Sequence, residues 1–229
     1  MRTGSTSRAS QARTMTIAVL GATGMVGGRV VGEASARGHR VLALSRKPAS
    51  EDPAVMPVAV DVTDPTAVRE ALAGSAADAV VLAVRTFPAD QEFLVGATRT
   101  VLDAAATLGI RVLVVGGAGA LRSPGDRALL VAENPVYVPD EYRPVALAGV
   151  AQLRTCQAHP GADWVYLSPP AVLEPGERTG RYRRGTDTLL TDADGGSRIS
   201  AEDLAVAVLD ELERPGVHRH LTVAHHRGA

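Results

Sequence analysis

The chain has 229 residues, 45% of them hydrophobic, and its 24 lysine and arginine side chains nearly balance 25 aspartate and glutamate side chains. This length suits one large α/β domain, and a net charge of −1 gives no general attraction to nucleic acid or to a membrane surface. No apolar stretch reaches the roughly 20 residues that a membrane-spanning helix needs, so we expect a soluble, cytoplasmic protein. The single cysteine, Cys156, cannot form an internal disulfide and is expected to pack inside the fold.

Residues 1–14 are rich in arginine, serine and threonine and contain no acidic residue. We expect them to form a disordered tail, and residues 15–229 to form one domain. A disordered leader, or a start codon at Met15, is favoured over an organellar transit peptide of similar composition.

Residues 15–28, MTIAVLGATGMVGG, predict a strand, a tight turn and the start of a helix. Glycines at this junction let the backbone approach a diphosphate closely and aim the first free N–H groups of the helix at it. The segment is therefore a predicted dinucleotide site. Its expected contacts are Gly21, Ala22, Thr23, Gly24, Met25, Val26 and Gly27.

Near-continuous apolar runs predict further strands at residues 39–44, 58–60, 79–84, 111–115 and 164–167. Helical spacing predicts helices near 27–37, 68–72, 92–108 and 145–158, and a last one with Ser200 as its cap and Asp203 as the return partner. Strands buried on both faces indicate a parallel sheet between helices. We therefore predict a Rossmann-type, doubly wound α/β sheet, with a small C-terminal substrate lobe at about residues 168–198.

The chain resembles the atypical short-chain dehydrogenases/reductases in its glycine turn, in VVGGAGAL, and in SPPAVLEPGERTGRYRRG followed by GGSRISAEDLAVAVLDELE. More specifically, it is similar to their NmrA-like, NAD(P)H-binding branch, often labelled NADH-flavin reductases, from residue 15 to about 223. The resemblance implies a bound nicotinamide dinucleotide and, in some relatives, reduction of flavins or quinones. Other relatives are non-catalytic redox sensors or act on specialised metabolites.

The end of the second predicted strand carries Ser45, Arg46 and Lys47, where an NAD-specific site usually has an acid. Arginine and lysine neutralise a ribose 2′-phosphate through charge-assisted hydrogen bonds, so we predict NADP(H) in preference to NAD(H). The alternative is that both are ordinary solvated charges, although Lys47 is the only lysine of the chain. Asp61 and Val62 match the family position beside the adenine, and helix capping by the acids of DVTD is an equal alternative.

Catalytic members of the superfamily use a tyrosine with a lysine four residues later, and a serine after the fifth strand. Here Tyr142 lies in about the right place, but Ala146 follows it, and glycines replace the serine. A tyrosine without that lysine is a poor proton shuttle at neutral pH, which disfavours reduction of ketones. Hydride transfer to a flavin needs mainly positioning, and with seven aromatic residues the chain is expected to bind flavin as a transient substrate.

Ligands of open parallel sheets bind at the carboxyl ends of the strands. Arg85 and Phe87 are candidates for the nicotinamide end, Arg85 to hold an anionic group and Phe87 to stack. A helix-dipole partner and a core aromatic are the respective alternatives. The expected crevice residues are Ala83, Val84, Arg85, Gly116, Gly117, Ala118, Ser168, Pro169 and Pro170.

Four arginines, Arg178, Arg181, Arg183 and Arg184, cluster around Tyr182 and either attract an anionic substrate or form a solvated hairpin. The six histidines lack the acids or cysteines of a metal site, so we predict none. The favoured function is NADPH-dependent reduction of a flavin or similar conjugated acceptor. A non-catalytic NADP(H) sensor and an enzyme of one specialised metabolite are the alternatives, and homo-oligomers or a regulatory protein partner stay open.

Overall fold

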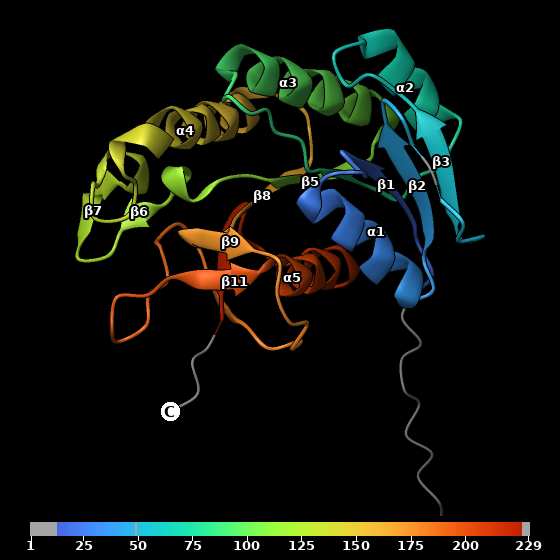
Figure 1. The fold of residues 1–229 in the computed structure, drawn as a ribbon. Helices are drawn as coiled ribbons and strands as arrows, with labels where there is room; N and C mark the ends of the chain where they lie inside the picture. The colour runs from blue at the N-terminus through green and yellow to red at the C-terminus, as the bar shows by residue number, and fades with distance from the viewer. Residues whose placement is uncertain (1–12, 49, 226–229) are drawn as a thin grey trace, which may run out of the picture.

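The computed structural model describes residues 13–48 and 50–225, and its centre is an eight-stranded sheet with helices on both faces (Figure 1). The strand order is β10-β12-β8-β5-β4-β1-β2-β3, and every neighbouring pair is parallel except β10 with β12. The chain therefore changes direction across the sheet between β1 and β4, which confirms the predicted Rossmann-type fold. The strands are β1 (Thr16–Leu20), β2 (Arg40–Ser45), β3 (Val55–Ala59), β4 (Ala79–Leu82), β5 (Arg111–Val115), β8 (Trp164–Ser168), β10 (Arg183–Gly185) and β12 (His220–Ala224).

Five helices cover the sheet, with α2, α3 and α4 on one face and α1 and α5 on the other (Figure 1). Their bounds are α1 (Met25–Ala36), α2 (Pro65–Ala73), α3 (Gln91–Leu108), α4 (Arg143–Ala158) and α5 (Ala201–Glu213). Alternate residues of each strand enter two separate apolar layers, so that Ala18 and Leu20 face α2–α4 while Ile17 and Val19 face α1 and α5. Burial on both faces explains why the strands are continuous apolar runs.

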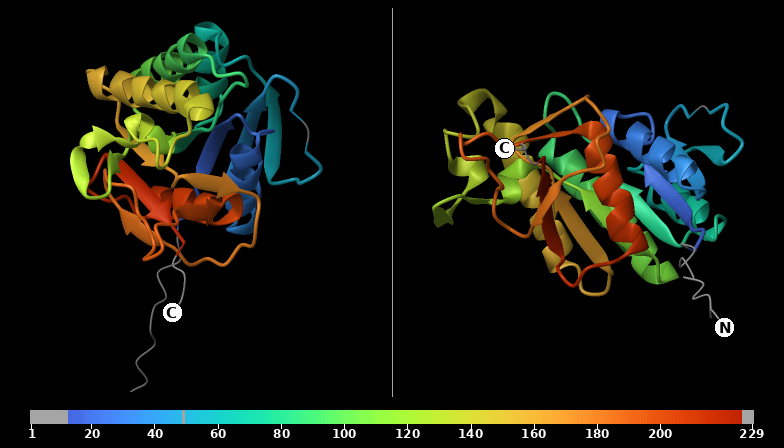
Figure 2. Two further views of the ribbon diagram at one scale, coloured as in Figure 1. Left: turned by 60° about the vertical axis from the view of Figure 1, so that its left-hand side comes forward. Right: turned by 90° about the horizontal axis from the view of Figure 1, so that it is seen from below.

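Two small sheets extend from the main body (Figures 1 and 2). One is the antiparallel hairpin of β6 (Arg122–Ser123) and β7 (Asp126–Leu130). The other pairs β9 (Val172–Glu174) with β11 (Arg198–Ser200) in parallel. Three short helical turns complete the order: η1 (Ala118–Ala120), η2 (Val131–Glu133) and η3 (Asp140–Tyr142).

The structure differs from the predicted elements mainly at the sheet edges. β3 begins at Val55 and passes through Pro57, because an edge strand tolerates a residue without an N–H donor. β12 was not predicted, since its five residues alternate too briefly to stand out beside the histidines around them. Most of the expected tail, and His226, lie outside the described residues.

Ser200 accepts a hydrogen bond from the Asp203 backbone N–H at 3.0 Å, which confirms the predicted cap of α5. The Asp203 carboxylate does not return this bond. It is fully buried and accepts from the Gly180 N–H at 2.7 Å and from the Thr179 hydroxyl, which tie the β9–β10 connection to the helix start. Within residues 13–48 and 50–225, every helix is too short or too polar to span a lipid bilayer.

Candidate functional site

The turn between β1 and α1 is shaped by close backbone contacts. Gly21 has a φ of +86°, and a Cβ there would lie 2.8 Å from the carbonyl carbon of Ala83 and closer still to its oxygen. A Cβ at Gly27 would lie 2.7 Å from the carbonyl carbon of Gly21, and one at Gly24 would lie 3.2 Å from its oxygen. Side chains at these positions would fill the turn, so the glycines keep a concave backbone surface open.

The first turn of α1 has no side-chain cap. Gly24 is the cap residue, and no acidic residue follows in the first turn. By contrast, Asp64, Asp90 and Ser200 each accept hydrogen bonds from the first turns of α2, α3 and α5. The backbone N–H groups and the positive end of α1 are thus left for an anion, and this cradle fits the diphosphate of a dinucleotide.

The segment after β2 carries the predicted phosphate contacts. Arg46 and Lys47 are exposed, and neither forms a hydrogen bond or ion pair with any described residue. The Ser45 hydroxyl is buried and lacks a hydrogen-bond partner among the described residues, while the Ser45 carbonyl accepts from the Val60 N–H at 3.0 Å. Two cationic side chains therefore follow the carboxyl end of β2, beside the glycine turn that follows β1. Their N–H donors are free to bind a ligand.

Asp61 follows β3 beside this segment. It accepts from the Thr63 N–H at 2.9 Å and from the Thr63 hydroxyl at 2.7 Å, and these bonds, with a smaller contribution from Arg46, hold its pKa below the usual value. Asp64, not Asp61, caps α2. The capping alternative is therefore correct for Asp64 and wrong for Asp61, whose carboxylate stays exposed. Val62 packs against the core beside α2.

Tyr166 supports the backbone after β5, where the superfamily serine is missing. Its ring fills the space in which Gly116 would carry a Cβ. The Tyr166 hydroxyl donates to the Gly149 carbonyl at 2.9 Å and accepts weakly from the Gly117 N–H at 3.4 Å. It also lies 3.1 Å from Gln152 Oε1. Sequence reasoning missed this residue, because nothing local marks a strand tyrosine as a partner of glycines 49 positions earlier.

Tyr142 ends η3 immediately before α4 and is 56% exposed. Ala146, one turn later, is 9% exposed and packs on η1, where a Cβ at Gly119 would lie 2.5 Å from the Ala146 carbonyl oxygen and 2.8 Å from its Cβ. The α4 backbone at Ala146 therefore approaches η1 closely at Gly119, and this position carries no lysine to pair with Tyr142.

The remaining crevice residues lie at the carboxyl ends of β4, β5 and β8. Arg85 is exposed, and Phe87 is 91% exposed, so its alternative role as a core aromatic is wrong. The Ala83 N–H donates to the Leu20 carbonyl between β4 and β1, where the strand order reverses. Val84 is half-buried, and Ala118 begins η1. Pro169 and Pro170 are buried behind the crevice.

Ser168 is fully buried, and its hydroxyl lies 3.0 Å from His220 Nε2. The His220 ring stands edge-on to Tyr166, with the ring centroids 5.5 Å apart. Burial lowers the pKa of His220 to about 4, so its imidazole is neutral at pH 7. The hydrogen bond between the neutral imidazole and the Ser168 hydroxyl joins β8 to β12.

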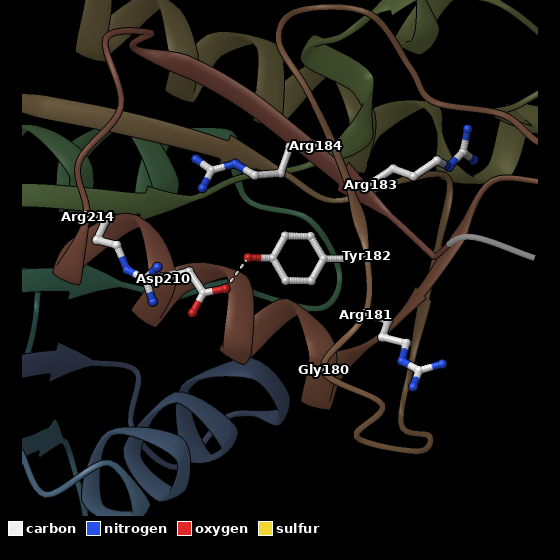
Figure 3. Close-up of a pocket in the computed structure, with 7 residues that line it drawn as sticks. All are labelled: Gly180, Arg181, Tyr182, Arg183, Arg184, Asp210 and Arg214. Atoms are coloured by element: carbon white, nitrogen blue, oxygen red, sulfur yellow. Dashed lines mark hydrogen bonds between the residues drawn. The ribbon is translucent and has the colours of Figure 1, made fainter. Parts of the chain in front are cut away.

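The arginine cluster is mostly occupied by ion pairs. Arg178 binds Glu33 of α1 through two hydrogen bonds of 2.7 and 2.8 Å, Arg183 pairs with Asp192 at 2.8 Å, and Arg184 pairs with Glu211. The side chains alternate along this segment, so that Tyr182 and Arg184 point toward α5 while Arg181 and Arg183 point away (Figure 3). These contacts fasten β10 and the segment before it to α1 and α5.

Cys156 is packed inside the fold, and three of the histidines contact carboxylates. Cys156 is buried, which raises the pKa of its thiol to about 12 and makes it unreactive at neutral pH. His39, His159 and His225 lie 3.0, 3.0 and 2.8 Å from Glu213, Asp103 and Asp203. Among residues 13–48 and 50–225, no group of three or more histidine, cysteine or acidic side chains could hold a metal ion.

A model of the NAD(P)H-binding family matches residues 21–215, from the first glycine of the turn to just beyond α5. The chain belongs to this NAD(P)H-binding family. The match confirms the resemblance to the atypical short-chain dehydrogenase/reductase branch, and membership implies a nicotinamide dinucleotide as cofactor.

Three relatives align with nearly the whole length of this chain. The uncharacterized protein YwnB of Bacillus subtilis (strain 168) is 38% identical over 209 residues, which are 88% of this chain and 93% of YwnB. A Bacteroides thetaiotaomicron structure, provisionally named an epimerase, is 34% identical with a TM-score of 0.84, over 95% of this chain and 100% of the other. A Streptococcus pneumoniae TIGR4 structure, provisionally named an NADH-flavin reductase, is 28% identical with a TM-score of 0.79, over 93% and 100%.

Proposed function

We propose that this protein is an NADPH-dependent reductase that passes hydride to a flavin or a similar conjugated acceptor. One combination carries the proposal: the glycine turn and the uncapped start of α1 fit a dinucleotide, while the position one turn after Tyr142 carries Ala146 in place of a catalytic lysine. A reaction that needs no side-chain acid suits such a site better than reduction of a ketone. The name of the Streptococcus pneumoniae relative supports this reaction class.

Each part of the crevice has one role in this proposal. The N–H groups at the start of α1 bind the diphosphate, and Arg46 and Lys47 bind the 2′-phosphate. The bound dinucleotide supplies the hydride. The backbone of Gly116 and Gly117, supported by Tyr166, orients the acceptor, and the buried Ser168 and the prolines after it support the neighbouring end of β8. Positioning then contributes most of the rate, and water provides the proton.

The reaction is tested by NADPH oxidation, followed by absorbance, against flavins, quinones and enones, with NADH as the control nucleotide. We expect turnover with flavins and a preference for NADPH. Tight NADPH binding without oxidation by any acceptor would contradict the reductase and favour a redox sensor. Such a sensor is the one alternative for which an absent acid–base pair is also expected.

The cofactor preference is tested by Arg46→Ala. We expect NADPH to bind more weakly by about 1.5–3 kcal/mol, the typical cost of a lost hydrogen bond to a charged group, while NADH affinity changes little. Calorimetric titration with both nucleotides measures the difference. Arg69→Ala on α2 is the matched control, since Arg69 is also exposed and belongs neither to the glycine turn nor to the segment after β2. Equal weakening of both nucleotides in Arg46→Ala would remove the case for phosphate recognition.

A second candidate function is conversion of one specialised metabolite, including a reaction without net oxidation or reduction. The Bacteroides thetaiotaomicron relative favours it, because a provisional epimerase shares this fold over its full length. This candidate predicts NADPH binding together with little activity on free flavins. The same acceptor panel therefore distinguishes it from the first proposal.

A further inference from the structure

A hollow of about 720 Å³ opens beside β10, between this strand and the end of α5 (Figure 3). We call it the edge groove. Arg184 points into it from β10 and Tyr182 from the residue just before this strand, and Arg214 reaches in from just beyond α5. Its lining residues are Gly180, Arg181, Tyr182, Arg183, Arg184, Asp210 and Arg214.

The edge groove is separate from the glycine turn. β10 is the last strand of the sheet, five strand positions from β1, which corresponds to roughly 24 Å at about 4.8 Å for each step. The end of α5 lies beside the amino ends of the strands, because Glu213 contacts His39, the residue immediately before β2. The glycine turn follows the carboxyl end of β1. A ligand in the groove would therefore leave the predicted cofactor crevice free.

The acidic side chains around the groove are already paired. Asp210 accepts from the Tyr182 hydroxyl and forms an ion pair with Arg37 at 2.8 Å. Glu211 is 1% exposed and binds Arg184. The guanidinium of Arg214 has no hydrogen bond or ion pair with any residue in the described ranges. Positive charge on the lining therefore exceeds the negative charge that could neutralise it.

The donors that remain suit an anion with several oxygens. A guanidinium carries five N–H donors, of which Arg184 uses one on Glu211 and Arg214 uses none within the described chain. Two planar guanidinium groups, one from β10 and one from the segment after α5, match the geometry of a phosphate better than that of a single halide ion. Burial and the neighbouring Asp210 raise the pKa of Tyr182, so the phenol stays neutral and does not repel an anion.

Tyr182 adds a second recognition feature. Its hydroxyl is held by Asp210, so the ring has one orientation, and it is the aromatic side chain on the groove lining. An aromatic ring beside two arginines favours a planar ligand that carries the phosphate. The hollow lies within the range of about 300–1,000 Å³ that small-molecule sites occupy. We propose that the edge groove binds an aromatic phosphomonoester, such as a mononucleotide, through Arg184, Arg214 and Tyr182.

The test is calorimetric titration of the full chain with uridine 5′-monophosphate, with uridine and inorganic phosphate as separate probes. Saturating NADPH is present in one arm, so that the cofactor crevice is filled, and absent in the other. We expect the nucleotide to bind in both arms, and uridine and phosphate each to bind at least about tenfold more weakly. No binding of the nucleotide, or equal binding of phosphate alone, would overturn the proposal.

Arg214→Ala is the decisive variant, because the Arg214 side chain has no partner in residues 13–48 and 50–225 whose loss would disturb the fold. We expect it to weaken nucleotide binding by at least about tenfold and to leave NADPH binding unchanged. Arg154→Ala, an exposed arginine of α4, is the matched control. Tyr182→Phe keeps the ring and is expected to retain binding, whereas Tyr182→Leu is expected to lose it. Equal affinity in the Arg214 and Arg154 variants would show that the nucleotide binds elsewhere.

Discussion

Around Gly21, Gly24 and Gly27 the chain is held by close backbone contact, whereas around Arg178 and β10 it is held by ion pairs. The turn is encoded in seven consecutive residues and leaves no space for side chains. The outer edge depends on Arg178 with Glu33, which are 145 residues apart, and on Arg37 with Asp210, which are 173 apart. Local sequence therefore determines the centre of the sheet, and tertiary charge pairing determines its edge.

Breaking the backbone contact should have the largest effect. Gly27→Ala places a Cβ against the carbonyl of Gly21, and we expect the free energy of unfolding to fall by about 3 kcal/mol, with loss of NADPH binding. Denaturant titration measures the change. Gly32→Ala in the same helix is the control: its Cβ meets nothing within 4 Å, and we expect about 0.5–1 kcal/mol of added stability. Similar results for the two variants would contradict the close-contact account.

Breaking the ion pairs should have a smaller effect. Glu33 is 7% exposed and binds Arg178 and Arg37, so we expect Glu33→Gln to lower the free energy of unfolding by about 2 kcal/mol. The exposed Glu70→Gln of α2 should change it little. NADPH affinity is expected to survive, because the glycine turn does not use these pairs. Loss of both together would show that the two regions are not independent.

The same glutamate predicts a pH dependence. The hydrogen bonds from Arg178, and then those from Arg37, lower the pKa of Glu33 below its unfolded value of 4.5. This stabilisation is complete above that value and is lost as the pH falls through the lower folded pKa. Glu33→Gln should therefore lose less stability than the wild-type chain on acidification below pH 4.5, as measured by unfolding at a series of pH values.

His220 lies on β12, between β10 and the strands that carry the glycine turn. It predicts a change of stability in a separate pH range. Its pKa falls from 6.5 to about 4 on folding because it is buried. The unfolded chain takes up a proton at higher pH than the folded chain, so stability should decrease as the pH falls from 6.5 and level off below 4. His220→Asn should flatten this part of the profile and change little at pH 7. An unchanged slope would mean that the imidazole is solvated.

The smallest effect is expected for Tyr142→Phe. The Tyr142 side chain is exposed and no lysine stands one turn later to pair with it, so we expect flavin turnover to change by less than about twofold. Steady-state kcat/KM with NADPH and a flavin measures it. A collapse of the rate would show that this side chain, and not water, provides the proton.

Most of the central fold could be predicted from the sequence, because its signals are local. The glycine turn, the apolar strands and the Ser200 cap each occupy a few consecutive residues. The residues at the carboxyl ends of β2, β4, β5 and β8 follow from them. The position of Arg46 beside the turn is a consequence of parallel pairing between β1 and β2. Its contact with a phosphate stays a prediction.

Features that depend on distant partners could not be predicted. Tyr166 supports Gly116 and Gly117 only because β5 and β8 are neighbours, and nothing near residue 166 indicates this. The arginines of β10 and of the segment before it resembled a substrate site, since the partners of Arg178 on α1 and of Arg184 on α5 lie far away in the sequence. The absence of a lysine at Ala146 was visible in the sequence, but the close packing of Ala146 against Gly119 was not.

Lys47 is the only ε-amine in this chain, and it stands exposed beside the predicted 2′-phosphate contact. Apart from the α-amino group, an acylating dye or an amine-directed crosslinker has therefore a single side chain to modify. A fluorophore attached there would report nucleotide occupancy without any engineered cysteine, and protection of this amine by NADPH but not by NADH would locate the phosphate directly.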